Sequence, residues 1–296
     1  MLSITSLINR LPGGIALGII WGIMALGVYI TFRVLKTSDL TVDGSFTTGG
    51  AVAIILILNG VSPILALVAS LIAGILCGIL TGLIHTRLKI PAILAGILVQ
   101  LALYSVNIHI MDGKSNQAIN PENYNLLIAI GNIPKSIIIG LIISILIISI
   151  LYWYFGTEQG CAIRATGNSS HMALAQGINI NNMNVIGFAL GNGLVALAGG
   201  LLAEYQGYAD INMGRGAIVI GLAAIIIGEV FCNAIFRKGS SFYARLSFVV
   251  VGGIIYYLVM ILILWLKVDS NDLKLFTAII VAIFLALPNF KKKGRQ

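Results

Sequence analysis

Long runs of apolar residues dominate this chain, and short polar segments separate them. A helix that crosses the hydrocarbon of a bilayer needs about 20 mainly apolar residues. Runs of that length, or slightly shorter, occur at 12–32, 46–59, 63–85, 91–107, 136–155, 183–203, 216–235, 244–266 and 274–288. The pattern predicts an all-α, polytopic membrane bundle of about nine spans (eight to ten). The second and last runs are short, so one of them could be a re-entrant or broken segment.

The composition supports a membrane protein. Hydrophobic residues make up 58% of the 296 positions and charged residues 9%, whereas soluble domains have about 45–50% apolar and about 25% charged residues. The run from Leu11 to Phe32 is longer than the roughly 7–15 residues of a signal-peptide core. We therefore expect it to be retained as the first span, within a single transmembrane domain that covers residues 1–296.

The distribution of positive charge predicts the orientation. Cytoplasmic loops are enriched in Lys and Arg. If the polar segment 156–179 faces the cytoplasm and nine spans alternate, 12 of the 18 basic residues lie inside: Arg33, Lys36, Arg87, Lys89, Arg164, Arg237, Lys238, Arg245, Lys291, Lys292, Lys293 and Arg295. The C-terminus is then cytoplasmic. The net charge of +8 is explained by topology, so we expect no nucleic-acid partner.

Glycine recurs every four residues in two of the predicted spans. The spaced glycines are Gly14, Gly18, Gly22, Gly74, Gly78 and Gly82, with a further pair at Gly187 and Gly191. Small residues at this spacing let helix backbones approach closely in lipid. The spacing predicts a tightly packed bundle.

No motif for catalysis, ATP binding or metal binding is visible. The three cysteines lack a C-x-x-C spacing and the three histidines lie far apart, so no metal site is expected. Gly113-Lys114-Ser115 is the only G-K-S, and Ile108 stands where a P-loop needs its first glycine. Neither H-E-x-x-H nor G-x-S-x-G occurs. We expect a chain that is not an enzyme and binds no cofactor itself.

Charged residues are scarce inside the predicted spans. None of the 28 charged residues is expected clearly at a midplane; Glu229 lies nearest, followed by Asp43 and Glu204 near the interfaces. Because ionisable groups in hydrocarbon are costly and usually functional, this distribution disfavours a proton-driven carrier. Sodium coupling through backbone carbonyls remains an alternative.

A stripe of uncharged polar residues follows one face of the fourth span. Gln100, Tyr104 and Asn107 are spaced at i, i+4 and i+7. Such a stripe either forms hydrogen bonds between helices or lines a translocation path. Asn192 in the sixth span poses the same choice.

The polar segment 156–179 predicts a short helix between two spans. Ser169 or Ser170 can cap its N-terminus, and Gly177 is placed to stop it after about Gln176. A short helix in a cytoplasmic connection is a natural contact for a soluble partner protein.

The same segment resembles the cytoplasmic coupling loop of ABC-transporter permeases of the branched-chain amino-acid and ribose class, and the resemblance places this loop within residues 156–182. That loop commonly reads G-x-A-x-R-A-x-G, then a short helix, then G-I-N. The matching positions, which the resemblance makes the ATPase-coupling residues, are Glu158, Gly160, Arg164, Ala165, Thr166, Gly167, Ala173 and Gly177. The resemblance implies that the short helix docks on a separate ATPase subunit.

A second stretch narrows the resemblance to a less characterised branch of this class. Residues 39–46 read DLTVDGSF and include the signature residues Asp39, Asp43, Gly44 and Ser45. The two acids either form a solvated or salt-bridged cap beside Arg33 and Lys36, or a turn at 43–45 caps the second span, or a half-helix, and lines the pathway. Residues 111–116 depart from the branch pattern, which makes partner contacts there the least secure inference.

The resemblance implies the permease subunit of an ABC importer in a prokaryotic inner membrane, working by alternating access. Its partners would be an ATPase subunit that holds ATP-Mg, an extracytoplasmic solute-binding protein, a second permease copy in a homodimer, and membrane lipid. The implied solute is an amino acid, which includes aromatic ones such as tryptophan or tyrosine, and a sugar or nucleoside is left open. A stand-alone secondary transporter or channel is the main alternative.

Overall fold

The computed structural model describes residues 4–120, 124, 126–236, 241–265, 275, 276, 278, 279, 281 and 282. Helices dominate, and the two strands are short. In chain order the elements are α1 (Ile4–Tyr29), the π-helical turn η1 (Ile30–Val34), α2 (Thr41–Leu58), α3 (Pro63–Arg87), α4 (Ala92–Ile110), β1 (Asn116–Ala118), the 3-10 turn η2 (Ile130–Asn132), α5 (Ile133–Gly156), α6 (Glu158–Asn168), α7 (Ser170–Ala175), α8 (Ile180–Gln206), β2 (Tyr208–Asp210), α9 (Ala217–Phe236) and α10 (Phe242–Trp265).

Eight of the described helices are long and apolar enough to cross a membrane, which confirms the all-α membrane bundle. Their ends agree with the first eight predicted spans to within a few residues, with two exceptions. α1 begins at Ile4 and α2 at Thr41, several residues before the predicted spans. The first turns of both helices contain polar residues, so a search for apolar runs places the start too late. The ninth predicted span, 274–288, and the C-terminus lie largely outside the described residues.

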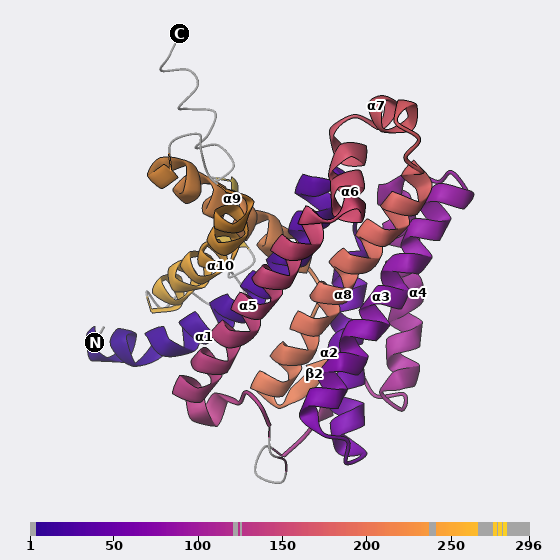
Figure 1. Ribbon diagram of the computed structural model, residues 1–296. Coiled ribbons are helices and arrows are strands. Elements are labelled where there is room, and N and C mark those ends of the chain that lie inside the picture. The colour runs from indigo at the N-terminus through magenta and orange to yellow at the C-terminus, as the bar shows by residue number, and fades with distance from the viewer. Residues whose placement is uncertain are drawn as a thin grey trace.

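The spans form two groups that meet along α1 and α8. α8 packs against α2 and α3, while α1 packs against α5, α9 and α10, and α1 and α8 contact each other. Figure 1 shows the two groups side by side, with α6 and α7 together at one end. The most enclosed spans are α1, in which 83% of an 18-residue apolar stretch is buried inside the protein, and α2 and α8, in which 72% is buried.

The predicted glycine rows lie at the closest helix contacts. A Cβ atom at Gly18 or Gly22 of α1 would collide with the backbone of α10, and one at Gly74 or Gly78 of α3 would collide with the backbone of α8. These contacts confirm the predicted close packing, since only a missing side chain allows the two backbones to approach so far.

The end opposite α6 and α7 carries a small ribbon that the sequence analysis did not predict. β1 and β2 pair antiparallel, with Gln117 opposite Ala209. Ile119 donates a further backbone hydrogen bond to Gly207 over 2.9 Å. The ribbon ties the connection after α4 to the connection between α8 and α9, and so fixes the segment that leads into α9.

Candidate functional site

The predicted short helix is present as α7. The Ser169 hydroxyl accepts a hydrogen bond from the Met172 N–H over 3.4 Å, as an N-cap does. Gly177 ends the helix with φ +78, and its N–H bonds the Leu174 carbonyl. The expected cap at Ser169 and stop at Gly177 are therefore confirmed.

A second helix, α6, precedes α7 and was not predicted from the sequence. The Thr157 hydroxyl accepts from the Gly160 N–H over 3.4 Å and caps it. Glu158, exposed in the first turn, suits the positive end of the helix dipole. A threonine followed by an acidic residue was the sequence signal that could have located this helix.

The motif residues of α6 hold it against the bundle. A Cβ atom at Gly160 would collide with the backbone of Phe155 in α5, and one at Gly167 would collide with the backbone of Val34 in η1. The Arg164 guanidinium donates to the Phe155 carbonyl over 3.4 Å and lies 5.6 Å from the centre of the Phe242 ring. Gly160, Arg164 and Gly167 thus join α6 to α5, η1 and α10.

The other motif residues divide between the packed and the exposed side. Thr166 is buried and donates to the Ala162 carbonyl over 2.9 Å, and Ala165 is half-buried beside it. Ala173 is 2% exposed, whereas its neighbours Met172 and Leu174 are 64% and 59% exposed. Two apolar side chains are therefore exposed on α7, which lies at one end of the bundle (Figure 1).

Asp39 lies buried in the bundle interior, and so the expected solvated or salt-bridged cap is wrong. Its carboxylate accepts from the Thr41 N–H over 2.9 Å and from the Asn192 amide over 2.6 Å. The Ser45 hydroxyl donates to the Oδ1 atom of the Asn192 amide, also over 2.6 Å. Arg33, the expected partner of the acids, instead pairs with Glu229. These hydrogen bonds compensate the loss of water around the Asp39 carboxylate.

Asp43 caps a helix other than its own. Its carboxylate accepts from the N–H groups of Gly216 over 3.0 Å and Ile218 over 3.1 Å, at the start of α9. The prediction that a turn at 43–45 caps the second span is therefore wrong, because α2 already begins at Thr41. A carboxylate at a helix N-terminus satisfies unpaired N–H groups and complements the helix dipole.

The interior location of Asp39 also corrects the expectation that no charged residue lies at mid-depth. Its partner Asn192 is the thirteenth of the 27 residues of α8, and neither residue is more than 2% exposed. Asn192 bonds Asp39 and Ser45 outside its own helix, and the Phe188 carbonyl one turn earlier in α8. Glu204 lies near the end of α8, as expected.

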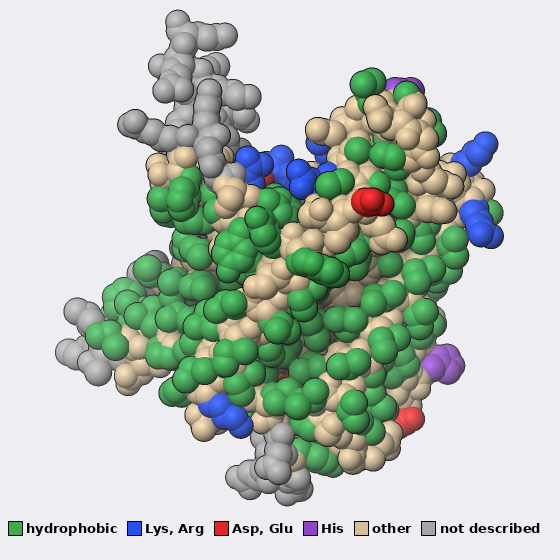
Figure 2. Space-filling model, in the orientation of Figure 1, with side chains coloured by type: hydrophobic (Ala, Val, Ile, Leu, Met, Phe, Trp, Pro, Cys, Tyr) green, Lys and Arg blue, Asp and Glu red, His purple; other side chains and the backbone are tan. Residues whose placement is uncertain are grey.

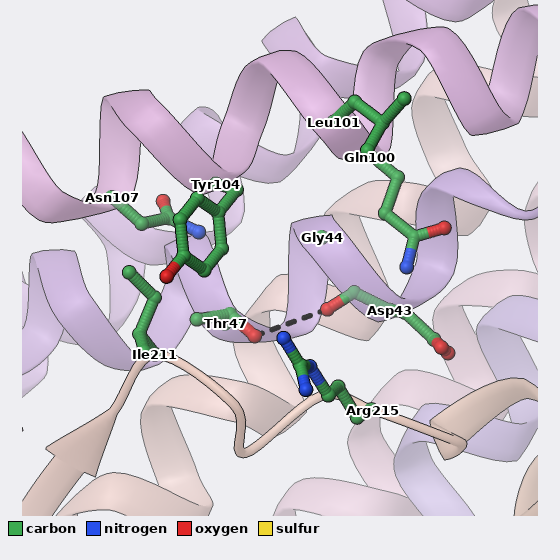
Figure 3. A pocket seen from close by; sticks show the side chains of 9 residues that line it. All are labelled: Asp43, Gly44, Thr47, Gln100, Leu101, Tyr104, Asn107, Ile211 and Arg215. Carbon is green, nitrogen blue, oxygen red and sulfur yellow. Dashed lines mark hydrogen bonds between the residues drawn. The ribbon is translucent and has the colours of Figure 1, made fainter. Parts of the chain in front are cut away.

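A cavity of about 310 Å³ opens between α2, α4 and the segment before α9. The predicted stripe on α4, namely Gln100, Tyr104 and Asn107, lines it together with Asp43 and Gly44 of the signature stretch. Figure 3 shows these side chains converging, with Arg215 reaching in from the opposite side. Asn192 and Ser45 do not line this cavity. Sequence reasoning missed Arg215, because its partners come from distant helices.

Two residues that line the cavity, Asn107 and Arg215, carry polar atoms without a hydrogen-bond partner among the described residues. The Oδ1 atom of Asn107 is buried without a hydrogen-bond partner. Among the described residues, no hydrogen bond or ion pair of the Arg215 side chain is seen, and this residue is exposed. The two Asp43 oxygens, in contrast, are already engaged by the α9 N-terminus. The cavity therefore offers a cation and an acceptor near an aromatic ring.

Residues 11–287 match the family described as branched-chain amino acid transport system / permease component. The chain belongs to this family. As a permease it is the transport subunit of an ABC-type system, and a multi-pass membrane protein rather than the ATPase. The match confirms the resemblance drawn from the coupling-loop and DLTVDGSF stretches.

Two relatives match along most of the permease. The tyrosine transport system permease protein of Clostridioides difficile (strain R20291) is 36% identical over 271 residues, covering 92% of this chain and 88% of the relative. An uncharacterised protein of Rickettsia prowazekii (strain Madrid E) is 32% identical over 273 residues, covering 91% and 94%. Among solved structures, PsaBC from Streptococcus pneumoniae in complex with Fab covers 87% of this chain and 95% of that one, with 16% identity and a TM-score of 0.44.

Proposed function

We propose that this permease moves an amino acid across a prokaryotic inner membrane along a path that includes the cavity between α2 and α4. The observation that carries the proposal is the convergence of the α4 stripe with the signature residues: Tyr104 and Asn107 face Asp43 and Gly44 across one cavity. Small-molecule sites have volumes of about 300–1,000 Å³ and a few convergent polar groups, and this cavity has both.

The polar groups of the cavity suit the two charges of an amino acid. The Arg215 guanidinium can bind a carboxylate, and the unpartnered Asn107 Oδ1 can accept from an ammonium group. Tyr104, 45% exposed, offers a ring for stacking. The name of the Clostridioides difficile relative favours tyrosine or another aromatic amino acid as the solute.

We also propose that the permease contacts a protein partner at each end and a second copy of itself. α7, with Met172 and Leu174 exposed, would dock on a separate ATPase that holds ATP-Mg, and Arg164 would pass the motion through α6 to α5 and α10. A binding protein would deliver the solute at the β1–β2 end. A second permease copy would complete the path, because the α4 face that carries Leu101 and Tyr104 is exposed in the single chain.

Uptake by reconstituted proteoliposomes tests this function. We expect uptake of labelled tyrosine to require the permease, the ATPase, ATP and the binding protein together. Arg215→Gln and Asn107→Leu should each reduce uptake about tenfold, as the loss of a charged or buried hydrogen bond of roughly 1.4 kcal/mol would. Lys114→Gln, which removes an exposed charge at the same end, is the control and should leave uptake unchanged.

The same assay separates the proposal from the stand-alone alternative. A secondary carrier or channel would move the solute in liposomes that contain the purified permease alone, with or without an ion gradient. Under the proposal Arg164→Glu uncouples ATP hydrolysis from uptake while the chain still inserts. Full uptake by the permease alone, or by Arg164→Glu, would contradict the coupling assignment.

A further inference from the structure

A second cavity lies at the α6–α7 end of the molecule and is lined by four basic side chains. Its volume is about 360 Å³, and Arg33, Lys36, Arg164 and Arg245 reach it from η1, the following turn, α6 and α10. Figure 2 shows Lys and Arg side chains gathered at this end, beside α6. Positive charges from three separate parts of the fold therefore converge on one space.

The contacts within this basic cavity leave an excess of positive charge. Glu229 pairs with Arg33, and Lys36 donates to the neutral Asn168 amide over 3.0 Å. Arg164 bonds a backbone carbonyl, and Arg245 interacts with the neutral Tyr29 side chain. Among the residues that the structure describes, one acid thus faces four bases, which leaves about three positive charges around the space. Such a convergence favours an anionic ligand.

An apolar groove of about 540 Å³ continues from the basic cavity. Tyr152, Trp153 and Phe155 of α5 line it, and it shares Arg164 and Phe242 with the basic cavity. Tyr152 and Trp153 are 53% and 71% exposed. Exposed Tyr and Trp side chains at the ends of spans are typical of the level where a bilayer meets water.

We propose that the basic cavity and this groove together bind one anionic phospholipid. The phosphate of the headgroup would lie among Arg33, Lys36, Arg164 and Arg245, and the glycerol and upper acyl chains would lie along Tyr152 and Trp153. Basic pockets between spans on the cytoplasmic side of a membrane bind anionic headgroups. A soluble phosphate would use the cavity alone, whereas the adjoining aromatic groove fits a molecule with an apolar part.

The bound lipid would bridge the coupling segment to the spans. Arg164 belongs to α6, while Arg245 belongs to α10 and interacts with Tyr29 of α1. One headgroup that contacts both arginines would restrain the motion of α6 relative to α10. Anionic lipid would thereby set how firmly the segment that precedes α7 is held to the bundle.

Native mass spectrometry of the purified full chain in detergent tests this site. The chain is titrated with phosphatidylglycerol and, separately, with phosphatidylcholine of the same acyl chains. We expect phosphatidylglycerol to be retained at least tenfold more strongly. The double variant Lys36→Gln/Arg245→Gln should weaken its retention about 25-fold, since each surface charge contributes about fivefold to anionic-lipid binding. Arg87→Gln, which removes an exposed charge at the same end but outside the cavity, should keep full retention.

Two further arms decide the source of the anion. Trp153→Ser should lower phosphatidylglycerol retention, whereas inorganic phosphate at millimolar concentration should not displace the lipid. Equal retention of the two lipids, or equal loss in the double variant and Arg87→Gln, would overturn the proposal. Displacement of the lipid by inorganic phosphate would overturn the proposal and show that the cavity binds a soluble anion. Exclusion of the lipid by an added acidic partner protein would also overturn it and assign the cavity to that protein.

Discussion

Asn192, near the middle of α8, donates a hydrogen bond to the Asp39 carboxylate over 2.6 Å, although the two residues are 153 positions apart. Ser45 completes the contact from α2. A carboxylate inside a membrane bundle is costly unless its oxygens are hydrogen-bonded. The pair therefore fixes where the connection before α2 enters the bundle.

A double-mutant cycle on this pair is the first prediction. Asp39→Ala and Asn192→Ala should each lower the free energy of unfolding by roughly 1–3 kcal/mol, because each leaves a buried polar partner unsatisfied. The double variant should lose less than the sum, with a coupling energy of about 0.5–3 kcal/mol. Unfolding in detergent measures both values. Strict additivity would show that the two side chains do not interact.

The cap that Asp43 provides for α9 gives the second prediction. Asp43→Ala should destabilise the permease by about 1 kcal/mol, as the loss of an N-cap does, and Asp43→Asn should cost less because one acceptor oxygen remains. Thermal unfolding in detergent measures the order. Asp112→Asn, an exposed isosteric change, is the control. A larger loss for Asn than for Ala would contradict the cap.

The close approach of α6 to η1 gives the third prediction. Gly167→Ala would press a methyl group against the Val34 carbonyl, so we expect a loss of about 1–3 kcal/mol and a displaced α6. Gly156→Ala is a matched control, because a Cβ atom there meets no atom within 4 Å. It should be neutral or slightly stabilising. ATPase coupling and thermal stability, measured together, distinguish the two variants.

Cysteine accessibility gives the fourth prediction. Cys161 in α6 is exposed, whereas Cys77 and Cys232 are buried. A membrane-impermeant maleimide should label the native permease at Cys161 and spare the two buried thiols. Because the charge distribution predicts that α6 faces the cytoplasm, inside-out vesicles should react and intact cells should not. Labelling of Cys161 in intact cells would reverse the orientation, and Cys161→Ser provides the blank.

Some residues of the cavity between α2 and α4, and the caps of α7, could be predicted from the sequence, and other residues could not. The stripe of Gln100, Tyr104 and Asn107 could be predicted because helical periodicity places these residues on one face. Arg215, which meets them across the cavity, could not, since it follows a strand pairing between distant connections. The α7 caps were predictable because Ser169 and Gly177 act on their own helix.

The sequence by itself determined which segments leave water and which family the chain resembles. A helix that crosses hydrocarbon requires a long apolar run, and each run is one continuous stretch of sequence. Eight of the predicted spans therefore appear as helices. The tertiary structure alone decided the partners of Asp39, Asp43 and Arg33, which lie 153 to 196 residues away along the chain. A buried polar group must find its hydrogen bonds wherever the packing of the helices places a donor, and that placement is not encoded in any single stretch of sequence.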